Sequence, residues 1–238
     1  MTTNGFLINK EMSKALRDSG LSSICFSVDS LKKETHNFLR GVDGAYDKLM
    51  SAIEYFSPYQ SPNIFIATII TKQNLFDLFE LAEWVNKNDR ICFIHFQALM
   101  QPFGVIENDY WHEEEEGKFI WPELGKVHDI LDKLIQLKSI GYKISNPLGQ
   151  LQAFKAYFED PRTFIKKMTK CNLGKDVVSI APDGNIFLCF QKDPIGNIKY
   201  DRIDEVWFSK KALYVREQIA NCRNNCKLMI NCFFEKEN

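Results

Sequence analysis

The chain has 238 residues, of which 45% are hydrophobic and 26% are charged, and its formal net charge is −1 at pH 7. This composition is typical of a globular protein with one or two domains, and the balanced charge excludes a general electrostatic attraction to nucleic acid. No apolar run approaches the roughly 18 residues of a membrane-spanning helix, and the chain does not start with the basic-then-apolar order of a secretory signal. We therefore expect a cytoplasmic protein with no nucleic-acid partner and no membrane partner.

The first part of the chain alternates helical patterns with short apolar runs. Helical patterns cover residues 10–19, 46–56 and 75–86. Apolar runs at residues 24–29, 64–70 and 91–96 predict three buried strands. Apolar strands separated by helices are typical of a parallel sheet covered by helices, so the predicted fold class is α/β, with an open sheet whose first strand is an edge.

After the third predicted strand the pattern changes twice. Residues 101–122 are interpreted as a loop, in which the acidic run at 113–116 is a solvated face. A strong helical pattern follows at 124–139, and another helix, interrupted at Asp160-Pro161, is predicted at 151–168, with a short strand at 142–144 between them. From there on the chain consists of short strands, glycine turns and cysteines. We therefore predict two domains, at residues 1–168 and 169–238, the second a small α+β domain rich in cysteine.

The seven cysteines are unevenly distributed along the chain. Two of them, Cys25 and Cys92, lie alone in apolar runs. The others gather near the C-terminus, at Cys171, Cys189, Cys222, Cys226 and Cys232. An odd total without a secretion signal argues against a disulfide framework, so this group of thiols predicts a metal site.

The spacing of these cysteines predicts how they come together. Asp183-Gly184 is a hairpin turn signal between two strand-like segments, and it presents Cys189 at the end of the second strand. Four thiolates suffice for zinc or for an iron–sulfur cluster, and five are present, so one is a spare that the spacing does not identify. The alternative is that these are buried thiols without a metal.

The same region resembles the SPASM/twitch domain, the auxiliary-cluster module of radical S-adenosylmethionine (radical SAM) enzymes. The matching features, in order, are Cys171-x12-Gly184-x4-Cys189, Gly196-Asn197-Ile198, Ile203-Asp204-Glu205-Val206-Trp207, Arg216 and the last three cysteines. The resemblance covers residues 171–234. Since Cys222-x3-Cys226 stands where Cys-x2-Cys is usual, and the full pattern has more cysteines, it implies one auxiliary [4Fe–4S] cluster.

The N-terminal part resembles the second half of the radical SAM barrel. Asn4 follows what looks like its third strand, Ser27-Val28-Asp29 looks like the Ser-x-Asp of its fourth strand, and His36-x3-Arg40-Gly41 matches the stretch that follows. The resemblance implies a partial (β/α) barrel in which Asn4, Ser27, Asp29 and Arg40 lie near S-adenosylmethionine. The alternative for Ser27 and Asp29 is that they only cap the next helix.

One feature of the family pattern is missing from these 238 residues. Radical SAM enzymes bind their catalytic cluster with Cys-x3-Cys-x2-Cys, and the chain contains no such spacing. We therefore expect an N-terminally truncated relative of a peptide- or protein-modifying enzyme that is inactive alone. The alternatives are half of a split enzyme, or a metal-stabilised binding or scaffold module without catalysis. His95 is interpreted as a core or barrel-mouth histidine rather than a metal ligand.

Overall fold

The computed structural model describes residues 1–101, 108–162, 171, 173–222 and 229–232. These residues form two compact units. The α/β unit comprises residues 1–101, 108–162 and 229–232, and the cysteine-rich unit comprises residues 171 and 173–222. No helix in the described ranges is both long and apolar enough to cross a membrane.

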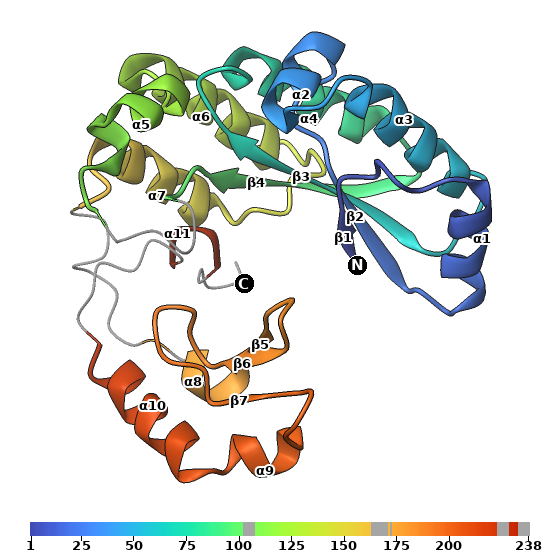
Figure 1. Ribbon diagram of the computed structural model, residues 1–238. Coiled ribbons are helices and arrows are strands. Elements are labelled where there is room, and N and C mark those ends of the chain that lie inside the picture. Colours follow the sequence, from blue (N-terminus) through green and yellow to red (C-terminus); the bar gives the residue numbers. More distant parts are fainter. Residues whose placement is uncertain (102–107, 163–170, 172, 223–228, 233–238) are drawn as a thin grey trace. The chain divides into compact units, whose positions relative to one another are not determined.

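The α/β unit is built on a four-stranded sheet in the order β1-β2-β3-β4. The strands β2 (Ser23–Ser27), β3 (Asn63–Ile70) and β4 (Ile91–Ala98) pair in parallel, as predicted. A further short strand, β1 (Thr2–Thr3), pairs in parallel with β2, so the strand that was predicted as an edge has a neighbour on both sides. Helices lie over one face of this sheet (Figure 1). They are α1 (Lys10–Asp18), α2 (Lys33–Arg40), α3 (Ala45–Phe56), α4 (Leu78–Lys87) and α6 (Leu124–Ser139), with a 3₁₀ turn, η1 (Leu75–Asp77), before α4.

Alternating side chains explain why the sheet holds these helices on one face. Ile24, Phe26, Ile64 and Ile66 are fully buried in the core beneath the helices. Because successive residues of a strand point to opposite faces, their neighbours point to the other side of the sheet. That second face carries the cavity described below.

A β-bulge determines which side chains of β4 face the helices. Ile64 pairs with Ile91, but the next residue, Phe65, pairs with Phe93, so Cys92 is an extra residue in the ladder. The extra residue reverses the alternation, and Ile94 and Phe96 are buried beneath the helices while His95 faces the other way.

The segment at 101–122 differs from the predicted loop. It contains a 3₁₀ turn, η2 (Trp111–Glu113), and the short helix α5 (Glu115–Ile120). Trp111 is buried and packs edge-on against Trp121, with ring centroids 5.5 Å apart, which holds the segment in place. The acidic side chains at 113–116 are exposed, as expected of a solvated face.

Two helices complete the α/β unit. Helix α7 (Leu148–Glu159) ends before Pro161, and residues 163–168 of the predicted helix lie outside the described residues. Helix α11 (Met229–Cys232) reaches the end of β4, where the Asn231 amide accepts from Ala98 N at 2.8 Å and donates to Ala98 O at 2.9 Å. The predicted strand at 142–144 is reduced to a single parallel bridge between Ile144 and Ile94.

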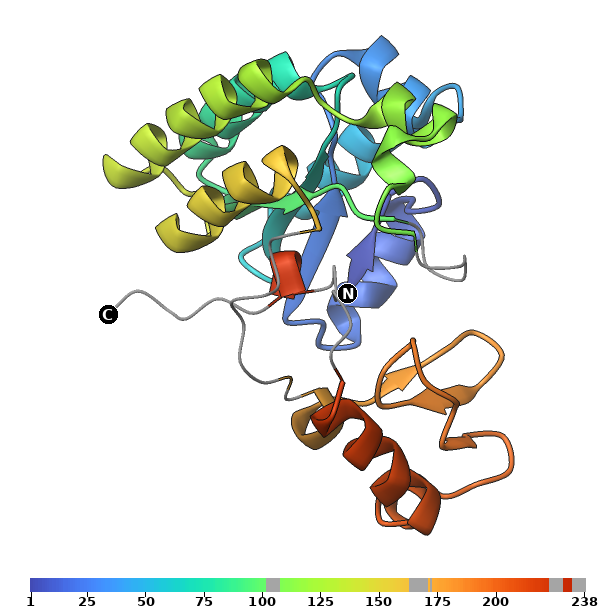
Figure 2. The ribbon, with the colours of Figure 1, turned by 90° about the vertical axis from the view of Figure 1, so that its left-hand side faces the viewer.

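The cysteine-rich unit contains a three-stranded antiparallel sheet and three helices (Figure 2). The strands are β5 (Ser179–Ile180), β6 (Asn185–Phe187) and β7 (Gly196–Asn197), and the helices are α8 (Leu173–Asp176), α9 (Ile203–Trp207) and α10 (Lys210–Ala220). Gly184 has φ +93°, as the predicted hairpin turn requires. Gly196 lies in β7.

Candidate metal and substrate site

The predicted metal ligands that the structure describes lie in the cysteine-rich unit. Cys189 follows β6, and both Cys189 and Cys171 are half-buried against the core of this unit, which includes Ile186 and Leu188. Cys222 is exposed, shortly after the end of α10. Cys226 lies outside the described residues, as does the side chain of Cys232.

The ionisation of Cys189 depends on the other two thiols. Burial raises the pKa of the Cys189 thiol, and the negative charges of ionised Cys171 and Cys222 raise this pKa further. The backbone N–H of Gln191 donates to the Cys189 sulfur and partly opposes that rise. The three thiols therefore share one electrostatic environment, although no three His, Cys, Asp or Glu side chains among the described residues are placed closely enough to hold a metal ion.

Arg216 connects the elements around these thiols. Its Nε donates to Gly174 O at 2.7 Å and its Nη1 to Trp207 O at 2.8 Å. The guanidinium also lies over the Trp207 ring, 4.4 Å from the ring centroid. This one side chain on α10 thus connects α8, which follows Cys171, to the C-terminal end of α9. Trp207 has a packing role, because its ring contacts the guanidinium.

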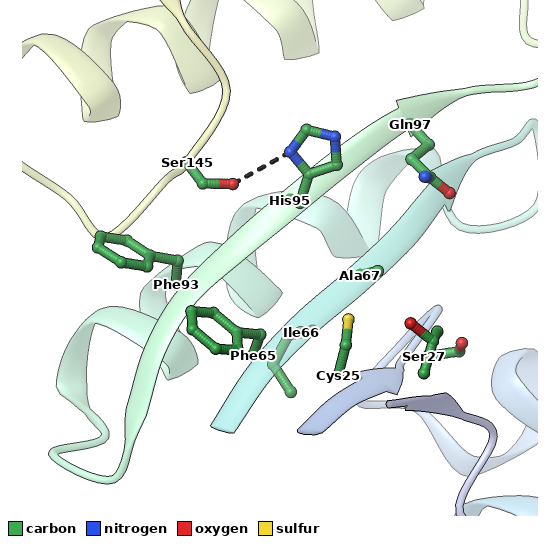
Figure 3. Close-up of a pocket in the computed structure, with 10 residues that line it drawn as sticks. Cys25, Ser27, Phe65, Ile66, Ala67, Phe93, His95, Gln97 and Ser145 are labelled. Carbon is green, nitrogen blue, oxygen red and sulfur yellow. Dashed lines mark hydrogen bonds between the residues drawn. The ribbon is translucent and has the colours of Figure 1, made fainter. Parts of the chain in front are cut away.

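The α/β unit has a cavity of about 360 Å³ on the face of the sheet opposite the helices (Figure 3). It is lined by residues of all four strands together with Ser145 from the loop before α7: Thr2, Cys25, Ser27, Phe65, Ile66, Ala67, Phe93, His95, Gln97 and Ser145. Its volume lies at the low end of the range for small-molecule sites.

Of the four predicted cofactor-binding residues, Ser27 lines this cavity, at the end of β2. Asn4 is exposed, and its side-chain oxygen accepts from Phe6 N at 3.1 Å. Asp29 is 5% exposed and forms an ion pair with Arg40, with Oδ2 and Nε 2.8 Å apart. The structure thus pairs the charges of Asp29 and Arg40 with each other, and Asn4, Asp29 and Arg40 are not among the lining residues.

A buried network surrounds the Asp29 backbone. Asp29 N donates to His36 Nδ1 at 3.2 Å, and Asn74 Nδ2 donates to Asp29 O at 2.8 Å. Burial raises the pKa of the Asp29 carboxyl, and the Arg40 charge partly opposes that rise. This network holds the segment that follows β2 and therefore positions Ser27 at the rim of the cavity.

Sequence reasoning did not single out the aromatic and amide side chains of the cavity. Phe65 and Phe93 are stacked, with ring centroids 6.1 Å apart and ring planes 15° from parallel. The available signal was the period-2 alternation along β3 and β4, which assigns residues to faces, but the bulge at Cys92 breaks that alternation in β4.

Comparisons with known proteins agree with both units. Residues 1–85 match the family model of the radical SAM superfamily, and residues 171–232 match SPASM, the iron–sulfur cluster-binding domain. The chain belongs to the radical SAM superfamily and carries a C-terminal domain of the SPASM family.

Two curated relatives come from Methanosarcina barkeri. The AdoMet-dependent heme synthase is 34% identical over 212 residues, which cover 87% of this chain and 59% of the relative. The Fe-coproporphyrin III synthase is 36% identical over 117 residues, which cover 48% of this chain and 29% of the relative. The chain thus spans less than two thirds of the length of either protein.

Solved structures share the fold. Streptococcus suis SuiB bound to its precursor peptide SuiA superimposes with a TM-score of 0.61 at 17% identity, covering 97% of this chain and 51% of SuiB. SuiB bound to S-adenosylmethionine gives the same TM-score.

Proposed function

We propose that this chain supplies the substrate-facing half barrel and the auxiliary [4Fe–4S] domain of a radical SAM protein. Cys171, Cys189 and two of Cys222, Cys226 and Cys232 are the proposed ligands. The observation that carries this proposal is the packing of Cys171 and Cys189 against one small core, inside the region that matches the iron–sulfur domain.

The donor chemistry of this unit suits such a cluster. Thiolates are the ligands of [4Fe–4S] clusters, and a backbone N–H aimed at the Cys189 sulfur is the kind of outer contact that orients a ligand and tunes a cluster. When bound, the cluster would supply a site for electron transfer or for substrate anchoring. The protein's part is to fix Cys189 on the hairpin and Cys171 against the same core.

The cofactor proposal concerns the rim of the cavity. Ser27 lines the cavity there, which supports it as a contact of S-adenosylmethionine in the complete protein. Asp29 and Arg40 act on that contact through the backbone, because their charges are paired with each other. Asn4 is left as an exposed candidate at the edge strand.

Two substrate classes are candidates for the cavity face. A peptide or protein is the class expected from the family resemblance, and the SuiB complex with SuiA supports it at the level of the fold. An iron tetrapyrrole is the second candidate. It is favoured by the stacked Phe65 and Phe93 beside His95, and by the relatives named as heme and Fe-coproporphyrin III synthases.

The cluster proposal is tested by anaerobic reconstitution with iron and sulfide. Cys189→Ser is expected to lower bound iron and acid-labile sulfide and the cluster absorbance, since one thiolate ligand is lost. Cys92→Ser is the matched control, because Cys92 is a half-buried cysteine in β4 that belongs to the other unit. It should bind as much iron as the unmodified chain.

The alternatives predict different outcomes. Equal iron content in Cys189→Ser and the unmodified chain would rule out Cys189 as a ligand. Zinc in the protein as purified, with no iron uptake, would support a metal-stabilised binding or scaffold module instead of a redox protein.

A further inference from the structure

The cavity floor is organised as three rows that run across the strands. In the first row, Thr2, Cys25, Phe65 and Phe93 are successive ladder partners. In the second row, Ala67 pairs with Ser27 on one side and with His95 on the other. In the third, Ile69 pairs with Gln97. The floor thus has an aromatic row beside a polar row with a small residue at its centre.

The second row separates two polar groups by one small side chain. Neighbouring strands lie about 4.8 Å apart, so Ser27 and His95 are on the order of 10 Å apart across Ala67. If Ser27 marks the cofactor side of the cavity, His95 marks the side left for a substrate. Figure 3 shows the His95 ring rising from β4 beside Phe93.

A hydrogen bond holds His95 through one ring nitrogen. Ser145 Oγ lies 3.2 Å from Ile94 O and 3.0 Å from His95 Nδ1, so it contacts both groups. In the tautomer that carries its proton on Nδ1, His95 donates to Ser145 Oγ and the lone pair of Nε2 is available to a ligand. A metal-binding histidine usually makes a hydrogen bond of this kind through its other ring nitrogen.

Burial favours the neutral form of the His95 ring. It lowers the pKa of His95, so the imidazole is neutral at pH 7. The other soft ligand in the cavity is Cys25, and burial raises the pKa of its thiol, which keeps it protonated and a poor ligand. Of these two residues, His95 is therefore the better ligand for an iron atom at this face of the sheet.

We propose that the cavity face binds an iron tetrapyrrole, with His95 Nε2 as an axial ligand of the iron and with Phe65 and Phe93 in contact with the macrocycle. This inference rests on the proposed function, which it deepens by naming the substrate class. Residues 93 and 95 are about 6.8 Å apart along one strand. A macrocycle centred over the imidazole therefore extends over the phenylalanine pair.

The probe is iron(III) coproporphyrin III, titrated into the cluster-reconstituted chain and followed by difference spectra in the Soret region. The unmodified chain should give a shifted Soret band, and after reduction and addition of nitric oxide its electron paramagnetic resonance signal should show the extra nitrogen hyperfine splitting of an axial imidazole. His95→Ala should lose that signal and bind at least about tenfold more weakly, since a coordinate bond is removed. Metal-free coproporphyrin III should bind both proteins equally, because stacking on the phenylalanine pair remains.

Two matched variants control for other ligands. His128→Ala removes a histidine on α6 whose Nε2 already donates to Lys155 O at 3.1 Å, and it should leave the spectrum unchanged. Cys25→Ser tests the other candidate ligand of the cavity, and loss of the imidazole signal in this variant would contradict the assignment to His95. Loss of metal-free porphyrin binding in His95→Ala would point to damage of the fold, and His95→Gln, which keeps the side-chain volume, then decides whether the iron signal depends on the imidazole.

Several results would overturn the inference. An unchanged iron signal in His95→Ala and His95→Gln would show that another group binds the iron. Absence of porphyrin binding by a chain that has taken up its cluster would refute the tetrapyrrole while leaving the proposed function intact, and a peptide would become the favoured class. Failure to take up iron and sulfide would instead refute the proposed function.

Discussion

His36 is a residue whose ionisation the fold suppresses strongly. It is fully buried on α2, and its Nδ1 accepts from Asp29 N. Burial lowers its pKa from 6.5 to about 4, and the positive charge of Arg40 adds to this effect. Protonation of Nδ1 would also set two N–H groups against each other. The segment after β2 therefore depends on a neutral imidazole.

This arrangement predicts that stability decreases in mild acid. Between pH 6.5 and 4 the unfolded chain binds a proton at His36 that the folded chain does not, so the free energy of unfolding falls as the pH falls through this window. From pH 7 to pH 5 the loss is about 2 kcal/mol. Urea unfolding followed by tryptophan fluorescence at the two pH values measures it.

The matched variants separate His36 from other groups. In His36→Asn this part of the pH dependence should disappear, whereas His128→Asn should retain it. The raised pKa of Asp29 has the opposite sign, because the folded chain then binds its proton first, so it cannot produce the predicted loss. Equal pH dependence in His36→Asn and the unmodified chain would contradict the prediction.

Strand β7 packs so closely against α9 that it has no room for a side chain at Gly196. A Cβ at Gly196 would lie 2.8 Å from Val206 Cγ2 and 2.9 Å from Asp201 Oδ2. Asp201 Oδ2 also accepts from Asn197 N at 2.8 Å, so it cannot move without losing that bond. Gly196 is therefore required by packing between β7 and α9, and its φ is not positive.

Gly196→Ala is expected to destabilise the three-stranded sheet by about 1–3 kcal/mol, since the added methyl group overpacks the contact with α9. Hydrogen exchange of the Ile195 amide, which donates to Ile186 O at 2.7 Å, reports on this sheet directly. Gly149→Ala is the control, because nothing lies within 4 Å of its Cβ position in α7. Equal protection of the Ile195 amide in both variants would show that the contact between β7 and α9 accommodates the methyl group with no loss of stability.

At the scale of the whole molecule, the two units correspond to two different tasks. The α/β unit offers a cavity on one face of a parallel sheet, and the cysteine-rich unit gathers thiols on a small core. A small core gains much from a metal that ties its elements together. Loss of the metal should therefore loosen the cysteine-rich unit and leave the strands of the α/β unit in place.

The 238 residues alone are expected not to cleave S-adenosylmethionine. They contain no Cys-x3-Cys-x2-Cys, so they lack the three closely spaced thiolates that hold the catalytic cluster in this family. Anaerobic reconstitution, reduction with dithionite and chromatography for 5′-deoxyadenosine test this expectation. Product above a control without protein would show that other cysteines bind a catalytic cluster.

The sequence by itself determined the parallel order of the strands and the helices between them. Apolar runs and helical spacing are local signals, and they placed β2, β3 and β4 to within a few residues. The hairpin of Cys189 and the family were also readable, because turn glycines and cysteine spacings are local. The assignment of the metal ligands stays a prediction.

Tertiary structure alone decided which side chains face the cavity and which charges pair. The bulge at Cys92 reverses the alternation of β4, and it results from pairing with β3, which no local pattern encodes. Asp29 and Arg40, both predicted as cofactor contacts, form an ion pair because α2 brings Arg40 back to the end of β2, and no local pattern encodes that pairing. The hydrogen bond of His95 Nδ1 likewise depends on Ser145, which lies far along the chain and is brought to the ring by the bridge between Ile144 and Ile94.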